Sequence, residues 1–439
     1  MKLVQSALAR WPDYARLEQA VEGGAVPGAV TGLSGVHKCC VIASLCKKTG
    51  RRALVLAADE AEAQRFCEDL AALGLRPVSY PLRDFNFRDT AGTSHEYERL
   101  RLEALSKLED GQCDCIVACM DAALQYTLGP EELERKLFTL RPGDQLEIAN
   151  LLEALVKCGY TQEDQIEGPG QFSHRGGIVD FFSPSASAPV RVEFWGDEVD
   201  SLSSFDMESQ RRTESIPQVT LAPCVEVIPE KPAFLAQKIE KLAASLRGKN
   251  APKAKEVLRG EAEKLKNGLR IGSMDKFIAL VYPQAATLFD YFPPEDSLLF
   301  FSEGNKLKER VRTTLWQWGE DLKSYLAEGL LCKGLDQYSQ DWEYALGKAE
   351  ETPTLFLDLF ARGSYEIPTK TLVNMTAKQL SPWGGGVELL AEDLRALLDQ
   401  GRACAVLTGT ERAGKALAED LKRAGLPAAW MDAASTVNP

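Results

Sequence analysis

Residues 168–212, GPGQFSHRGGIVDFFSPSASAPVRVEFWGDEVDSLSSFDMESQRR, have the pattern of an antiparallel meander of three strands. We expect the strands at residues 172–182, 190–195 and 198–205. Serine, alanine and proline form the first connection, and Gly-Asp at 196–197 forms a tight hairpin turn. The stretch therefore predicts a small, mostly antiparallel sheet.

Alternation along the strand at 190–195 separates its side chains into two faces. The core face is expected to carry Val190, Val192 and Phe194, and the polar face Arg191, Glu193 and Trp195. Tryptophan and arginine dominate the residues that contribute most to protein–protein binding. The polar face is therefore a candidate protein-binding surface.

The spacing of this stretch resembles the inserted second domain shared by the repair protein UvrB and the transcription-repair coupling factor family, Mfd. The matching patterns are G-x-F-x-x-R-G-G-I-V-D at 170–180, P-x-R-V-E-F at 189–194, D-E-V-D-S at 197–201 and F-D-x-x-S-Q-R at 205–211. In that family the domain binds the repair protein UvrA. The last pattern is more similar to Mfd than to UvrB.

The resemblance implies a UvrA-binding role for three residues of this sequence. Arg175 and Arg191 match arginines that the family uses at the interface, and Trp195 stands where family members usually have phenylalanine. The alternative for Arg191 is a cross-strand pair with Glu198 or Asp200 inside the sheet.

Length and composition describe an ordinary globular protein. The 439 residues suggest about three domains. A formal net charge of −13 argues against a nucleic-acid-binding surface along the whole chain, and no apolar run is long enough to span a membrane. Eleven scattered cysteines and three histidines do not form a zinc pattern, so we expect reduced, mostly buried thiols in a cytoplasmic protein without a metal site.

Residues 31–40, TGLSGVHKCC, occupy the position of a phosphate-binding loop between a strand and a helix. The loop needs G-x-x-x-x-G-K-S/T, in which glycines admit phosphate and the hydroxyl holds magnesium. Gly32 and Lys38 are present, but His37 replaces the second glycine and Cys39 the hydroxyl residue. The sequence therefore predicts a degenerate nucleotide site.

A second part of that site is altered far along the chain. LFDYFP at 288–293, the strand at 297–301 and SEGN at 302–305 resemble the segment of UvrB that ends in the motif D-E-S-H. Glu303 is retained, whereas Ser302 replaces the aspartate that anchors magnesium. UvrB's long DNA-clamping hairpin is also expected to be missing, because residues 81–105 pass with a short loop.

The last segment has the pattern of a separate unit. We expect helices at 389–400 and 410–424 with a strand at 403–407 between them. GTERAGK at 409–415 matches G-x-x-x-x-G-K, but Ala416 replaces the hydroxyl residue, so a plain strand-turn-helix is favoured.

The expected architecture is α/β: a degenerate helicase-like domain of the P-loop NTPase type with a parallel sheet, an inserted α+β domain, and a small α/β domain. The expected boundaries are 1–137 and 224–365 for the two parts of the first domain, 138–223 for the insertion and 366–439 for the third domain, which we expect to be incomplete.

The resemblance implies the N-terminal UvrB-homology region of a transcription-repair coupling factor, which binds UvrA and brings nucleotide excision repair to stalled RNA polymerase. No catalytic residue, cofactor or ATPase activity is expected in this portion. Family members continue into an RNA-polymerase-binding domain and an ATP- and magnesium-dependent translocase on double-stranded DNA, so we expect a longer protein. The alternatives are an ATP-dependent DNA enzyme of the UvrB type and a nucleotide-binding regulator that uses Lys38 or Lys415.

Overall fold

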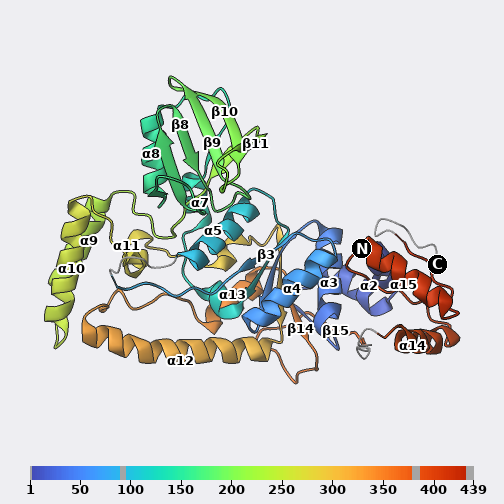
Figure 1. Ribbon diagram of the computed structural model, residues 1–439. Helices are drawn as coiled ribbons and strands as arrows, with labels where there is room; N and C mark the ends of the chain where they lie inside the picture. The colour runs from blue at the N-terminus through green and yellow to red at the C-terminus, as the bar shows by residue number, and fades with distance from the viewer. Residues whose placement is uncertain (1, 89–94, 378–385, 432–439) are drawn as a thin grey trace.

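A parallel seven-stranded sheet forms the centre of the computed structural model, which describes residues 2–88, 95–377 and 386–431 (Figure 1). The strand order is β15-β1-β14-β13-β2-β4-β3, and each neighbouring pair is parallel. The strands are β1 Gly28–Thr31, β2 Arg52–Ala57, β3 Pro77–Tyr80, β4 Cys115–Cys119, β13 Ser297–Ser302, β14 Thr354–Asp358 and β15 Thr371–Asn374.

Helices cover both faces of this sheet, as parallel sheets require. Alternate residues of β2 enter two separate cores: Leu54 and Leu56 pack in one, and Val55 packs in the other. The helices on the Val55 side are α1 Lys2–Ala9, α2 Pro12–Glu22, α3 Gly35–Thr49 and α4 Glu60–Ala72. Those that contribute to the Leu54 side include α5 Glu96–Glu109, α6 Met120–Leu124, α7 Pro130–Lys136, α9 Pro232–Ser245, α10 Ala251–Lys266, α11 Ile278–Val281, α12 Gly304–Glu328 and α13 Trp342–Glu351, with short 3₁₀ helices η1 Met274–Phe277 and η2 Leu288–Tyr291.

The inserted domain rises from one side of this body (Figure 1). It contains a six-stranded sheet of order β11-β10-β9-β8-β7-β6 and a two-stranded sheet, β12-β5. Its elements are β5 Phe138–Leu140, α8 Ile148–Lys157, β6 Thr161–Gln162, β7 Gln171–Arg175, β8 Ile178–Phe181, β9 Val190–Trp195, β10 Glu198–Phe205, β11 Arg212–Ser215 and β12 Val219–Leu221. A buried core between the sheet and α8 includes Leu151, Leu155 and Val192.

Two of the three expected strands of the meander, residues 190–195 and 198–205, are confirmed. The single strand expected at 172–182 is wrong, because the chain turns at Gly176 and forms the hairpin β7–β8. Gly176 has φ +60°, a conformation that side chains disfavour. The glycine pair at 176–177 is the sequence signal for this turn.

The C-terminal residues depart further from expectation. The helices are confirmed as α14 Val387–Asp399 and α15 Glu411–Arg423, but residues 403–407, expected as a strand, form none and are exposed. A single strand has no ladder partner, and no neighbouring strand is formed within residues 386–431. Cys404 is therefore exposed, an exception among thiols that were expected to be mostly buried. The sheet also continues past the boundary expected at 365, since β15 pairs with β1.

The hairpin expected to be missing would fall in the connection from β3 to α5, which spans residues 81–95. Its described residues, 81–88 and 95, form no strand, and residues 89–94 lie outside the described part of the chain. No helix among the described residues is long and apolar enough to cross a membrane.

Candidate functional site

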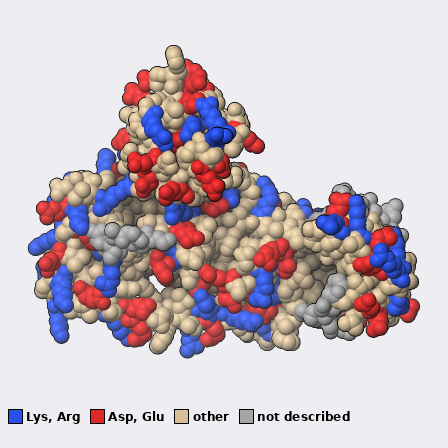
Figure 2. Space-filling view, in the orientation of Figure 1, with Lys and Arg blue, Asp and Glu red and all other residues tan. Residues whose placement is uncertain are grey.

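The three residues expected to bind protein share one face of the six-stranded sheet. Strand register aligns Arg175 of β7 with Ile178 of β8 and Glu193 of β9. Arg191 and Trp195 lie two residues to either side of Glu193, so their side chains leave the sheet on the same side. The opposite side packs on α8. We call the side that carries Arg175, Arg191 and Trp195 the outer face. Figure 2 shows a group of basic side chains on this domain, above acidic side chains near its base.

Arg191 and Asp180 form a bidentate ion pair on the outer face. Nε and Nη2 of Arg191 donate to the two carboxylate oxygens of Asp180, each at 2.8 Å. The Asp180 side chain is 5% exposed and that of Arg191 17% exposed. The hydrogen bond with Asp180 raises the pKa of Arg191. The structural alternative for Arg191 is therefore a real cross-strand pair, but its partner lies on β8 and is neither Glu198 nor Asp200.

Arg175 and Trp195 are the freely accessible members of the predicted set. Arg175 is exposed, and its Nη2 donates only to the backbone oxygen of Asp164, at 3.2 Å. Trp195 is 83% exposed at the end of β9, where Gly196 takes φ +64° and turns the chain into β10. The Trp195 ring is exposed to water, and a partner that covered it would remove this apolar surface from water.

Sequence reasoning missed a second ion pair on the outer face. Arg212, the first residue of the edge strand β11, pairs with Glu193, which also accepts a hydrogen bond from Ser201 Oγ at 2.9 Å. The Arg212 side chain is 48% exposed and that of Glu193 24%. The Arg-Arg sequence at 211–212 was the signal that could have drawn attention to this residue.

The degenerate loop uses its glycine for packing against other strands. Gly32 N donates to the backbone oxygens of Asp358 and Leu359, each at 3.1 Å. A Cβ at Gly32 would lie 2.4 Å from the backbone oxygen of Met375, where the chain leaves β15. The amide that would face a phosphate in an active loop is therefore already bonded within the protein.

Lys38 is likewise engaged inside the protein. Its Nζ donates to Glu303 Oε1 at 2.6 Å and to Ser302 Oγ at 3.0 Å, and Ser302 Oγ donates to Glu62 at 3.1 Å. The Lys38 side chain is 3% exposed. The structure thus brings together the two parts of the predicted degenerate site. The carboxylate of Glu303 pairs with Lys38, the cation that would bind phosphate in an active loop.

His37 and Cys39 stand where a phosphate-binding loop needs a glycine and a hydroxyl residue. Burial lowers the pKa of His37, whose Nδ1 lies 3.3 Å from Ser34 Oγ. Burial raises the pKa of Cys39, and its Sγ lies 3.9 Å from an oxygen of Asp69 on α4. A protonated thiol directed at a carboxylate is a poor ligand for magnesium. Within the described ranges, no cluster of histidine, cysteine or acidic residues could hold a metal ion.

The second lysine considered for nucleotide, Lys415, lies on the exposed surface of α15. Its Nζ donates to Glu411 at 2.6 Å and lies 4.8 Å from the centre of the Trp430 ring. A Cβ at Gly414 would meet Thr408 and Trp430 within 3 Å. These contacts match a helix packed on its own loop, and the loop does not form a phosphate cradle.

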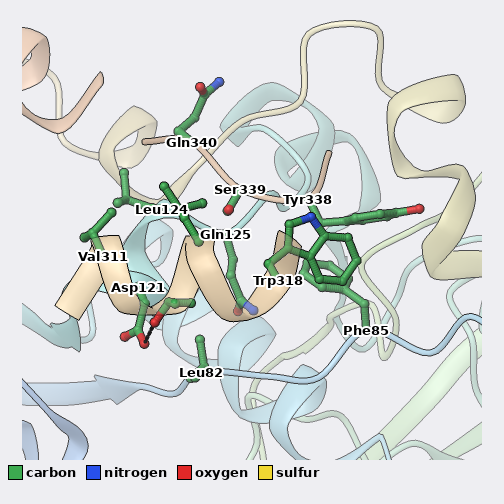
Figure 3. Close-up of a pocket in the computed structure, with 12 residues that line it drawn as sticks. Leu82, Phe85, Asp121, Leu124, Gln125, Val311, Trp318, Tyr338, Ser339 and Gln340 are labelled. Atoms are coloured by element: carbon green, nitrogen blue, oxygen red, sulfur yellow. Dashed lines mark hydrogen bonds between the residues drawn. The ribbon is translucent and has the colours of Figure 1, made fainter. Parts of the chain in front are cut away.

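An apolar pocket lies beside the short connection after β3 (Figure 3). Phe85, Trp318 and Tyr338 line it, and the Phe85 and Tyr338 rings lie 5.1 Å apart. At its edge Asp121 accepts hydrogen bonds from Arg310 at 2.7 Å and Thr314 at 3.1 Å. These aromatic side chains pack together where the connection passes α12.

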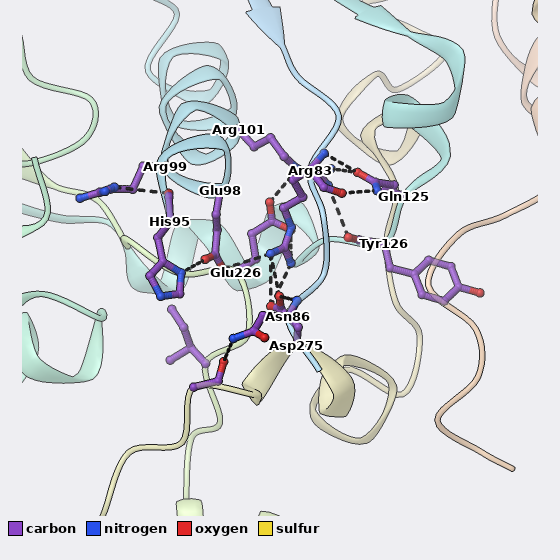
Figure 4. A network of polar contacts seen from close by, with 12 residues as sticks. Arg83, Asn86, His95, Glu98, Arg99, Arg101, Gln125, Tyr126, Glu226 and Asp275 are labelled. Atoms are coloured by element: carbon purple, nitrogen blue, oxygen red, sulfur yellow. Dashed lines mark hydrogen bonds and ion pairs between the residues drawn. The ribbon is translucent and has the colours of Figure 1, made fainter. Parts of the chain in front are cut away.

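A buried network of charges joins the inserted domain to the first domain (Figure 4), and sequence reasoning missed it entirely. Arg83 contacts Asp275 at 3.1 Å and Glu226 at 3.5 Å, while Arg101 contacts Glu226 at 2.7 Å. Burial raises the pKa of Glu226 and of Asp275. Glu226 lies where the chain leaves the inserted domain, so the two arginines hold this exit against the first domain.

Glu98 and His95 extend this network to the surface. Glu98 accepts a hydrogen bond from the backbone N of Glu226 at 2.6 Å, and its other oxygen lies 2.7 Å from His95 Nδ1. Burial opposes ionisation of Glu98, but Arg83 and His95 together lower its pKa. The hydrogen bond with Glu98 raises the pKa of His95.

Comparisons with known proteins match both the insertion and most of the chain. The UvrB interaction domain family model matches residues 138–226, close to the boundaries expected for the insertion. The chain is 27% identical over 404 residues to the transcription-repair-coupling factor of Bacillus subtilis (strain 168), which covers 90% of this chain and 34% of that protein. It is 24% identical over 397 residues to the corresponding factor of Staphylococcus epidermidis (strain ATCC 35984), with 87% and 33% covered. The chain spans about a third of the length of the curated relatives it matches.

Proposed function

Because the chain resembles the N-terminal region of transcription-repair coupling factors over most of its length, we propose that it is a recruitment module. Its inserted domain binds UvrA through the outer face and so links nucleotide excision repair to stalled transcription. This portion does not hydrolyse ATP. A cytoplasmic location agrees with that role.

The exposure of both Arg175 and Trp195 on the outer face is the observation that carries the proposal. Trp195 is 83% exposed, and Arg175 lacks a carboxylate partner among the described residues although it lies on the same face. An accessible aromatic ring and a guanidinium without a carboxylate partner among the described residues, both on one face, fit a partner that supplies an apolar pocket and a carboxylate.

The closed nucleotide site favours recruitment over the ATP-dependent alternative. A phosphate would have to displace Glu303 from Lys38, and the Gly32 amide is already bonded. No feature of the described residues favours the UvrB-type enzyme or the nucleotide-binding regulator. For the longer protein we propose RNA polymerase and double-stranded DNA as further partners, in keeping with the relatives' role in coupling transcription to repair.

A titration of the 439-residue chain with purified UvrA tests the proposal. Arg175→Ala and Trp195→Ala should each weaken binding roughly tenfold or more, with unchanged melting, since both side chains are exposed. Lys157→Ala is the matched control, because Lys157 lies on α8, at the other side of the sheet, and pairs with Glu153. Undetectable binding by the unaltered chain, or full binding by both variants, would overturn the proposal.

A further inference from the structure

We propose that Arg212 is a third cation of the UvrA-binding face and that Glu193 competes with the partner for it. The partner surface opposite β9 to β11 is then acidic. This inference rests on the proposed function, because it assigns further contacts to the same face.

The two ion pairs on the outer face differ in how firmly they are held. Asp180 is buried, and Arg191 binds it through two hydrogen bonds, so a partner could not take Arg191 without leaving a buried carboxylate unpaired. Arg212 and Glu193 are both solvent-accessible, and exposed pairs contribute little to stability. Arg212 can therefore exchange Glu193 for a carboxylate of a partner.

Glu193 can remain in place when Arg212 is released. Its second oxygen accepts the Ser201 hydrogen bond at 2.9 Å, which keeps the carboxylate on the sheet. The charge of Glu193 then repels an acidic partner that approaches Arg212 or the neighbouring Arg175. Glu193 thus lowers the affinity of Arg212 and Arg175 for an acidic partner.

The accessible arginines of this face indicate the partner's chemistry. Three arginines on the outer face are balanced by three carboxylates, Asp180, Glu193 and Glu198, the last of which lies opposite Trp195 in the strand register. The whole chain has a formal net charge of −13, so a face without net charge is less acidic than the rest of the chain, and its exposed Arg175 and Arg212 fit acidic groups of a partner. Oppositely charged surfaces steer association and determine register.

The test measures UvrA affinity for Glu193→Gln, Arg212→Ala and the double variant at low and high salt. Glu193→Gln should tighten binding roughly two- to fivefold and Arg212→Ala should weaken it by a similar factor, because each removes one exposed charge. In the Arg212→Ala background, the substitution at Glu193 should yield a smaller gain. All differences should shrink at high salt.

Glu153→Gln is the matched control, since it removes an acid from an exposed pair on α8, at the other side of the sheet. Unchanged or weaker binding by Glu193→Gln, or unchanged binding by Arg212→Ala, would overturn the inference. If Arg175→Ala abolishes binding while Arg212→Ala does not weaken it, the proposed function survives and this inference fails. If neither arginine matters, both fail.

Discussion

Lys38 and Glu303 lie 265 residues apart in the sequence and form an ion pair of 2.6 Å between the degenerate loop and the end of β13. Lys38 is the residue that would neutralise phosphate in an active loop, and Glu303 is the residue retained from the acidic motif. These two residues of the predicted degenerate site therefore neutralise each other. The pair joins α3 to the start of α12 across the carboxyl edge of the sheet.

This pair should contribute to stability. Lys38→Met should lower the free energy of unfolding by about 2–4 kcal/mol, because it leaves Glu303 with an unpaired, mostly buried charge. The double variant Lys38→Met/Glu303→Gln should recover part of that loss. Urea unfolding of the three proteins measures both effects, and a single variant as stable as the unaltered chain would contradict the prediction.

The closed site should not bind ATP. Calorimetric titration with magnesium-ATP should yield no saturable heat at millimolar nucleotide, because Glu303 already neutralises Lys38. A saturable signal that disappears in a folded Lys38→Met variant would show that the site still accepts nucleotide. Lys415→Met is the control for the second G-x-x-x-x-G-K sequence.

Arg191 and Arg175 should respond differently to truncation. Arg191→Ala leaves the buried Asp180 unpaired and should lower the free energy of unfolding by about 2–4 kcal/mol. Arg175→Ala should change it by less than about 0.5 kcal/mol, because the side chain is exposed. Thermal melting distinguishes the two variants. Equal melting temperatures would mean that the pair of Arg191 with Asp180 does not stabilise the fold.

His95 should make the stability of the contact between the inserted domain and the first domain depend on pH. We call this contact, formed by the buried charges around Glu226, the neck. The hydrogen bond with Glu98 raises the folded-state pKa of His95 above its ordinary value of 6.5. The stabilisation is therefore fully present below about pH 6.5 and is lost as the pH rises through the raised pKa. The difference in unfolding free energy between the unaltered chain and His95→Gln should be largest near pH 6 and shrink towards pH 8.

His174→Gln controls for the loss of a histidine elsewhere, since His174 is exposed and its Nε2 contacts only the backbone oxygen of Gly176. A difference for His95→Gln that stays constant across this pH range would show that the neck does not depend on the charge of His95.

Local sequence determined the elements whose signals lie within a few residues. The strands at 190–195 and 198–205 followed from alternation and from the Gly-Asp turn between them. Asp59, the N-cap residue of α4, accepts a hydrogen bond from the backbone N of Glu62 at 2.8 Å, a contact between residues only three apart. The sequence at 31–40 also predicts an altered loop, because phosphate binding requires particular residues at fixed spacing.

Tertiary structure alone decided which partners these residues have. Alternation placed Arg191 on the polar face, but only the pairing of β9 with β8 brings it to Asp180. Residues 403–407 have a strand's composition, yet a strand requires a neighbour to complete its hydrogen bonds, and none is formed within residues 386–431.

The buried charges at the neck are a second case in which the sequence does not reveal which residues pair. Arg83, Glu226 and Asp275 come from three distant segments, and no periodicity or spacing links them. The cost of burying each charge is offset only when the fold brings its counter-charge to within a few ångströms. Sequence thus determined the local elements and the altered loop, whereas the fold determined the charge pairs, because these depend on contacts between distant parts of the chain.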